Sequence, residues 1–164
     1  MQQALNFRSA LLAARSCSFD ADVQVHYGEE LFSFGLACAY ETDGIAELTV
    51  TSPQTIKGIR AKIGKDGASF EFDDMAIALA PLANGNLAPM EFPRLLGTCW
   101  AKEYIRAAGT DGERFRVTYL SGYDDQELTV DVWFGLASCE PEYCEVSYNG
   151  EMLLSANITD FSMN

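Results

Sequence analysis

Apolar and polar side chains alternate along residues 19–27 of the chain, which read FDADVQVHY. The odd-numbered positions are apolar and the even-numbered positions are polar. A period of two places one set of side chains on a buried face of a sheet and leaves the other set in water. The segment is therefore predicted to be a β-strand with one dry face.

The same period recurs along much of the chain. Strands are predicted at residues 32–40, 46–51, 55–63, 69–73, 75–79, 115–119, 128–134, 146–148 and 154–158, with a loop at residues 80–90. Gly58 interrupts the apolar register of the segment at 55–63, which predicts a bulge or bend there. The links are short, and Asn149-Gly150 is a strong hairpin signal. Because parallel strands need crossovers of about a dozen residues, the sheet is predicted to be an antiparallel meander.

Two segments show helical spacing instead. Residues 4–15 carry Ala4, Phe7 and Leu11 on one face, and residues 91–108 carry a broad apolar stripe that includes Leu96 and Trp100. The proline at position 93 suits a first helical turn, and the glycine at position 109 suits a helix end. Both segments are therefore predicted to be amphipathic helices.

These elements predict an α+β fold that is mostly β. A sheet of about ten strands must curl or close, so we expect an unclosed barrel of antiparallel strands. Its apolar face needs a cover, and the two helices are the candidates for that cover on the concave side. The chain shows no linker or repeat, so residues 1–164 are interpreted as one domain.

Composition narrows the function further. The chain has 164 residues, is 48% hydrophobic and carries a formal net charge of −13. So acidic a chain repels phosphate backbones and anionic membrane surfaces, and nucleic-acid binding is therefore not expected. The start lacks the basic and apolar regions of a signal peptide. The chain is thus either cytosolic or the mature part of an exported protein.

Several segments resemble a known family. They are residues 17–23 (CSFDADV), 27–29 (YGE), 46–53 (AELTVTSP), 56–63 (IKGIRAKI) and 66–73 (DGASFEFD). With the opening helix, they make the chain similar to the LolA/LolB-like lipoprotein-carrier superfamily, and within it to uncharacterised lipoproteins of Gram-positive anaerobes. The resemblance covers nearly the whole chain.

The resemblance implies a half-barrel with helices acting as a lid over a hydrophobic cavity that accepts acyl chains. It also implies an extracytoplasmic domain, tethered to a membrane only by an N-terminal lipid that is absent from this chain. The implied partner is a lipid or an acylated protein, and we expect a monomer without a cofactor.

A hydrophobic ligand cavity is the first candidate site. Its lining is predicted to come from the first two strands and the second helix, with an ordinary filled core as the alternative. The residues concerned are Phe19, Val23, Phe32, Phe34, Leu36, Tyr40, Leu96, Trp100 and Tyr104.

The remaining candidates favour no chemistry. The acid pairs at positions 29–30, 73–74 and 124–125 fall in predicted turns, and His26 lies on the wet face of its strand. Cys38 and Cys99 are predicted to be buried, whereas Cys139 and Cys144 flank a turn and could be disulfide-bonded or free. We expect no metal site and no catalytic residue. The alternatives to a lipid-binding domain are a partner-binding or envelope-sensing module and a small hydrolase.

Overall fold

The computed structural model describes residues 1–70 and 89–164. Its helices are α1 (Gln2–Ala14) and α2 (Phe92–Ala101), with short 3-10 helices η3 (Pro89–Glu91) and η4 (Asp124–Gln126). Its strands are β1 (Ser16–Tyr27), β2 (Glu30–Glu41), β3 (Ile45–Ser52), β4 (Arg60–Gly64), β5 (Gly67–Phe70), β6 (Tyr104–Asp111), β7 (Arg114–Ser121), β8 (Leu128–Gly135), β9 (Pro141–Tyr148) and β10 (Glu151–Met163).

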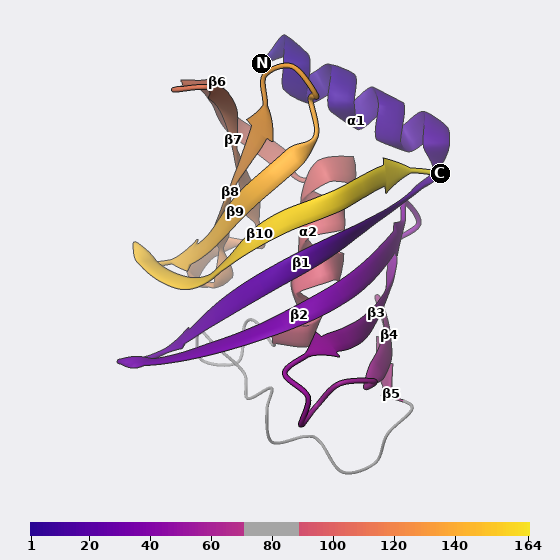
Figure 1. Cartoon of the computed structure of the whole chain (residues 1–164). Coiled ribbons are helices and arrows are strands. Elements are labelled where there is room, and N and C mark those ends of the chain that lie inside the picture. Colours follow the sequence, from indigo (N-terminus) through magenta and orange to yellow (C-terminus); the bar gives the residue numbers. More distant parts are fainter. Residues whose placement is uncertain (71–88) are drawn as a thin grey trace.

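Across the described residues, all the strands form one antiparallel sheet (Figure 1). Its order is β5-β4-β3-β2-β1-β10-β9-β8-β7-β6, so two meanders of consecutive strands meet where β1 pairs with β10. No pairing joins the two edge strands β5 and β6 within the described residues. The predicted unclosed antiparallel barrel is confirmed.

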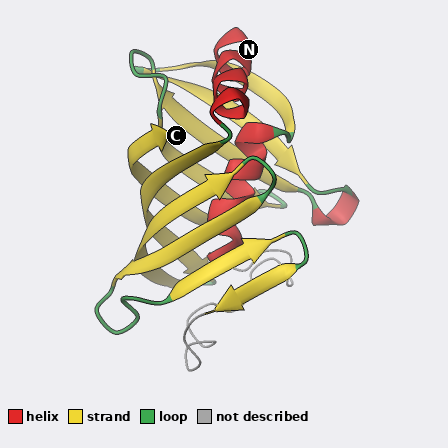
Figure 2. Cartoon of the chain, turned by 90° about the vertical axis from the view of Figure 1, so that its right-hand side faces the viewer, coloured by secondary structure: helices red, strands yellow, loops and turns green. Residues whose placement is uncertain are grey.

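The two helices cover the concave side of the sheet at different places. Helix α2 runs along the hollow and contacts β2, β3 and β7 (Figure 2). Helix α1 lies across one end of the hollow, where it contacts α2 and β1. The core therefore sits between α2 and the inner face of the sheet, with α1 closing one end.

The alternation seen in the sequence sets this arrangement. Along β1, Cys17, Phe19, Ala21, Val23 and Val25 are buried, whereas the aspartates and the glutamine between them are exposed. Successive side chains of a strand point to opposite faces, so the apolar set faces α2 and the polar set faces water. Burial of these apolar side chains is the main force that holds the helices on the sheet.

One predicted helix is shorter than expected. Helix α2 ends at Ala101, and residues 104–111 form strand β6 rather than a continuation of the helix. Tyr104 lies four residues after Trp100, so the apolar spacing continued although the helix did not. The backbone amide of Lys102 donates to the carbonyl of Thr98, and the chain then turns away from the helix.

The segment predicted as a strand at 55–63 is also different. Residues 53–58 form turns, and β4 begins at Arg60. The amide of Gly58 donates to Val50 O, and Val50 N donates to Ile59 O, so the chain reverses tightly there. Strand β5 covers the start of the segment predicted at 69–73. The strand predicted at 75–79, the acid pair at 73–74 and most of the loop at 80–90 lie outside the described residues.

Candidate functional site

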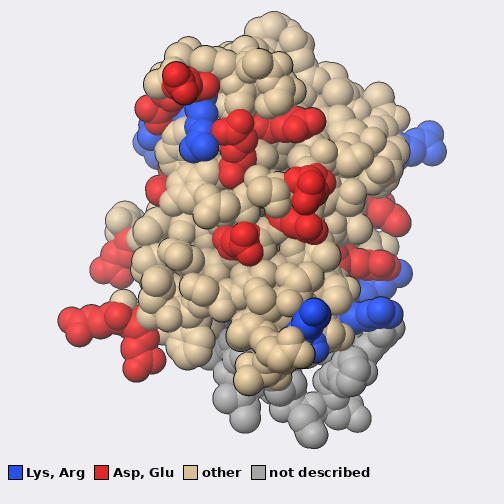
Figure 3. All heavy atoms as spheres, viewed as in Figure 1, with Lys and Arg blue, Asp and Glu red and all other residues tan. Residues whose placement is uncertain are grey.

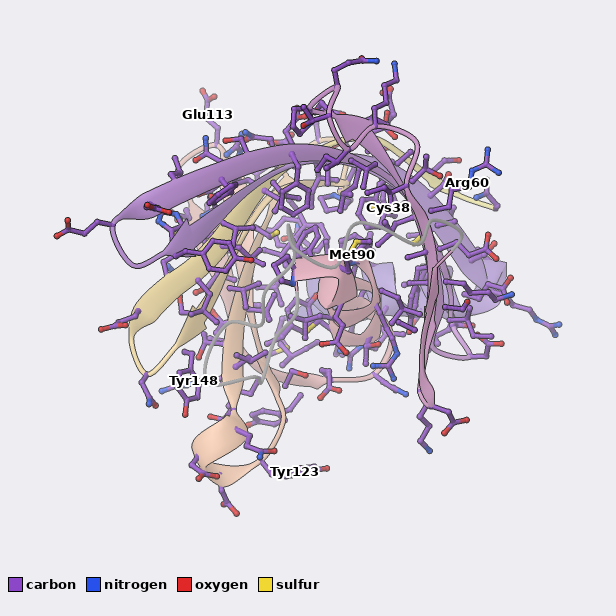
Figure 4. The ribbon with its side chains drawn as sticks, turned by 90° about the horizontal axis from the view of Figure 1, so that it is seen from below. Cys38, Arg60, Met90, Glu113, Tyr123 and Tyr148 are labelled. Carbon is purple, nitrogen blue, oxygen red and sulfur yellow. The ribbon has the colours of Figure 1, made fainter. Side chains whose placement is uncertain are left out.

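Seven of the nine residues predicted to line a cavity lie together between β1, β2 and α2. Each is at most 7% exposed; they are Phe19, Val23, Phe34, Leu36, Tyr40, Leu96 and Trp100. Figure 4 shows side chains from the sheet and from α2 filling the space between them, with Cys38 and Met90 inside and Arg60 and Glu113 pointing outward. These seven residues therefore belong to one continuous core.

Trp100 lies at the centre of an aromatic cluster in this core. Its ring centroid is 5.3 Å from that of Phe19, 5.8 Å from that of Phe7 and 5.6 Å from that of Phe161, each in an edge-to-face arrangement. Aromatic pairs favour this geometry because the positive edge of one ring meets the negative face of another. The indole Nε1 is buried without a hydrogen-bond partner. Residues from α1, β1, α2 and β10 thus meet at one side chain.

Helix α2 approaches the sheet closely at Gly97. A Cβ atom added there would lie 2.2 Å from Cγ of the Tyr40 ring, closer than real carbon atoms approach each other. The absence of a side chain lets the Tyr40 ring, which is fully buried, pack directly on the helix backbone. The Tyr40 hydroxyl is 3.5 Å from Thr98 Oγ1. This contact fixes how deeply α2 sits in the hollow.

Arg8 of α1 ties the end of α2 to the first helix. Its Nε donates to the carbonyl of Trp100 at 2.9 Å, and one terminal nitrogen donates to the carbonyls of Cys99 at 2.9 Å and Glu103 at 2.6 Å. The last carbonyls of a helix have no partner within the helix and carry partial negative charge, so a guanidinium satisfies both needs. The sequence pattern did not single out Arg8, because its partners lie more than ninety residues away.

Two of the predicted lining residues lie elsewhere. Tyr104, on β6, is 67% exposed and is not part of the core, because the helix on which it was placed ends before it. Phe32 is 51% exposed near the tip of the β1–β2 hairpin, where its ring packs edge-to-face on Tyr27 at 5.6 Å. Whether any of the nine residues contacts a ligand stays a prediction.

Two clefts of the described part of the chain lie at the margins of this core. One, of about 350 Å³, lies between α2 and the β7–β8 connection and is lined by charged groups that include Arg94, Lys102 and Glu103. Burial raises the pKa of the Glu103 carboxyl, while the nearby Lys102, Arg8 and Arg94 lower it. Another, of about 400 Å³, lies between α1 and the end of β10 and includes Phe7, Phe161 and Cys139.

The other candidates show no converging polar cluster. Both described acid pairs, at 29–30 and 124–125, are exposed. His26 is half-buried on the outer face of β1, and its Nε2 has no hydrogen-bond partner. Among the described residues, no group of three His, Cys, Asp or Glu side chains is placed to hold a metal ion.

All five cysteines are free thiols in the structure. Cys38 and Cys99 are buried, as predicted, and so are Cys17 and Cys144, whereas Cys139 is exposed. Cys144 faces the core and Cys139 faces solvent, so the two that flank the turn are not bonded to each other. Burial raises the pKa of the Cys17 thiol to about 12 and raises the pKa values of Cys38, Cys99 and Cys144 well above their ordinary range.

Comparison with known proteins gives matches of fold but not of sequence. No protein-family model matches the chain, and no curated protein is similar to it in sequence. Among solved structures, it is similar to an uncharacterized conserved protein from Thermus thermophilus, with 12% identity and a TM-score of 0.48, covering 99% of this chain and 86% of that one. None of the described helices has the length and hydropathy needed to cross a membrane.

Two further solved structures are similar over nearly the full length of the chain. One is the CwlD amidase from Clostridioides difficile in complex with the GerS lipoprotein, with 14% identity, a TM-score of 0.46, and coverage of 98% of this chain and 93% of that one. The other comes from Nitrosomonas europaea, with 9% identity, a TM-score of 0.47, and coverage of 98% and 93%. That protein is described as a LolA superfamily protein.

Proposed function

We propose that this chain is a non-enzymatic, extracytoplasmic binding module that takes a protein partner on its outer surface. The packing of the concave face carries the proposal. Seven of the side chains predicted to line a cavity are buried in one core between the sheet and α2. Since close-packed interiors leave few voids larger than a water molecule, an acyl chain would have to displace α2 to enter.

Several large apolar side chains remain exposed on the outside of this core. Leu31 and Phe32 lie near the tip of the β1–β2 hairpin, and Leu5 and Leu12 lie on the outer face of α1. Exposed aromatic and aliphatic side chains are common anchors of protein interfaces. The β1–β2 hairpin is the favoured contact, because Phe32 and Tyr27 already form an aromatic pair there.

The charge of the chain constrains the partner. Figure 3 shows acidic side chains across the middle of one face, with the basic ones mostly near its margins. With a net charge of −13, long-range attraction favours a partner whose facing surface is basic. Salt should therefore slow the association more than it speeds dissociation.

Photo-crosslinking in the source cells tests this function. The photoreactive residue p-benzoylphenylalanine replaces Phe32 in one variant and the exposed Asp66, in the turn between β4 and β5, in the control. We expect a discrete protein adduct with the Phe32 variant and a weaker one with the control, because Phe32 belongs to the β1–β2 hairpin whereas Asp66 lies in the β4–β5 turn at one edge of the sheet. Adducts to lipid alone, or the absence of any adduct at either position, would refute a protein partner.

A second candidate is the binding of an acyl chain, the finer expectation from the sequence. It is favoured by the half-exposed Phe32, which continues the inner apolar row of β2 beyond α2. With Trp133→Phe, Trp100 becomes the sole tryptophan and reports on the core. Titration with oleate should leave its emission unchanged if the core stays packed, and native mass spectrometry of the purified protein should show no retained lipid. A shift in Trp100 emission with a bound lipid mass would favour the second candidate.

A further inference from the structure

Strand β6 forms one edge of the sheet and has a free side. It pairs with β7 only, over the register from Tyr104↔Leu120 to Asp111↔Arg114. Strand β6 is eight residues long. Natural sheets protect their edges with short strands, proline or lysine. Strand β6 (YIRAAGTD) contains neither proline nor lysine, although a bulge interrupts it between Ile105 and Ala107.

The hairpin geometry identifies which backbone groups point away from β7. Asp111 pairs with Arg114 across a two-residue turn, so these two residues form a hydrogen-bonded pair. From there, every second residue of β6 directs its amide and carbonyl toward β7, and the residues between direct theirs away from it. Ala108 and Thr110 therefore direct their amide and carbonyl groups toward the free edge. No described segment pairs with these groups. Unpaired groups on a strand edge are a template for another extended backbone.

The two faces beside this edge differ in character. On the outer face, Ala107 and Gly109 form the floor of a groove of about 380 Å³, with Arg116 and Thr118 beside them. On the inner face, Ile105 and Ala108 are half-buried and continue the apolar core. An added strand would therefore need apolar side chains on one face and polar side chains on the other.

The local charge differs from that of the rest of the chain. Residues 104–121 contain three arginines and two acids, a net charge of +1, whereas the whole chain carries −13. Arg114 is paired with Glu142 at 2.7 Å, and Arg116 lies 3.7 Å from Asp131. Arg106, exposed at the bulge, has no charged partner among the described residues and is the cation left for an incoming carboxylate.

From these observations, we propose that β6 binds an extended segment of the partner protein by strand addition. The segment adds a strand beside β6, with alternating apolar and polar side chains and a carboxylate beside Arg106. The inference rests on the proposed partner-binding function and names one place where the partner binds. Backbone hydrogen bonds supply the affinity, and the alternating side chains together with Arg106 supply the selectivity.

The test uses a phage-displayed library of random dodecapeptides selected on the purified full chain. We expect selected peptides to alternate apolar and polar residues and to contain an acid. Ala108→Pro should weaken their binding by about tenfold or more, because proline removes one free-edge amide while leaving the ladder to β7 intact. Ala108→Val, the control, keeps that amide and should bind as the parent does.

Two further measurements make the result decisive. Thr110→Pro repeats the test at the other free-edge position. If one of the two proline variants folds poorly, which a lower Tm would show, the other variant still decides the outcome. Arg106→Gln should weaken the binding of acidic peptides and leave the binding of neutral peptides unchanged. Peptides that bind Ala108→Pro and Thr110→Pro as well as the parent, or a library that yields no binders, would overturn strand addition. So would a dimer of the parent chain, seen by light scattering, that is lost in Ala108→Pro, because the occupant would then be a second copy.

This inference can fail while the proposed function survives. If the protein adduct formed through position 32 persists in an Ala108→Pro background, the partner binds without the β6 edge. If no protein adduct forms in either background, the partner-binding function itself is wrong.

Discussion

At the scale of single residues, the position of α2 depends on one missing side chain. Gly97 rests on the Tyr40 ring, and the space that a Cβ would occupy is already taken. Glycine within a helix costs about 1 kcal/mol relative to alanine, because it loses more backbone freedom on folding. At Gly97 the close approach of the buried Tyr40 ring outweighs that cost.

Gly97→Ala is therefore expected to destabilise the fold despite its better helix propensity. Overpacking a core costs about 1–3 kcal/mol, and Tyr40 cannot move aside because it is fully buried. Urea unfolding followed by circular dichroism measures the free energy of unfolding. The control is Gly109→Ala on β6, where an added Cβ meets nothing within 4 Å and should cost little. Equal stability of Gly97→Ala and the parent would mean that α2 does not sit at this depth.

At the scale of elements, alternation predicted the strands well where one face is buried. In β1, β2 and β8 the period of two reports a real difference between core and solvent. The end of α2 could not be predicted in the same way. Leu96, Trp100 and Tyr104 keep helical spacing, but the carbonyls of Cys99, Trp100 and Glu103 bind Arg8, which is distant in sequence. Local patterns do not contain such contacts.

For the candidate site, the sequence predicts which side chains face the helices but not whether they leave a cavity. Seven of the nine residues assigned to the concave face do lie there, because strand period and helix period each give the direction of a side chain. Whether that face encloses a cavity depends on volumes and on the depth of α2, which Gly97 sets. Strand β6 and its free edge were missed because its residues were assigned to a helix.

The hydrogen bonds from Arg8 to the end of α2 predict that the fold becomes less stable when Arg8 is replaced. Arg8→Met should lower the free energy of unfolding by about 2–3 kcal/mol, because partly buried helix carbonyls lose a charged donor. Arg8→Lys should recover part of the loss, since one ammonium cannot reach all three carbonyls in the same geometry. The control is Arg15→Met, which removes an exposed arginine at the end of α1 and should leave the Tm nearly unchanged. Equal Tm values for the Arg8 and Arg15 variants would contradict the role of Arg8.

At the scale of the whole molecule, the burial of four thiols predicts that the fold becomes less stable at alkaline pH. Their pKa values in the folded chain lie above those in the unfolded chain, so folding favours the protonated thiol. The stabilisation is complete below the ordinary pKa of 9.0 and is lost as the pH rises toward the folded pKa, about 12 for Cys17. Between these two pKa values, each such thiol lowers the free energy of unfolding by about 1.4 kcal/mol per pH unit.

Urea unfolding at pH 8, 9, 10 and 10.5 measures this dependence. We expect the free energy of unfolding to fall above pH 9, and Cys17→Ala to reduce the slope by the share of one thiol. Cys139→Ala removes the exposed thiol and should leave the slope unchanged. A slope that Cys17→Ala does not alter would place the pH dependence elsewhere in the molecule.

The pairing of β1 with β10 has a consequence for when the chain can fold. These strands join the two meanders at the middle of the sheet, and the amide of Asn164 donates to the carbonyl of Ser16. A contact between such distant positions has a high loop-closure cost, and topologies rich in such contacts fold slowly. During synthesis, the first meander therefore has no neighbour on its β1 side until the last strand has been made. A nascent chain of this design stays open at the middle of its sheet for most of its synthesis.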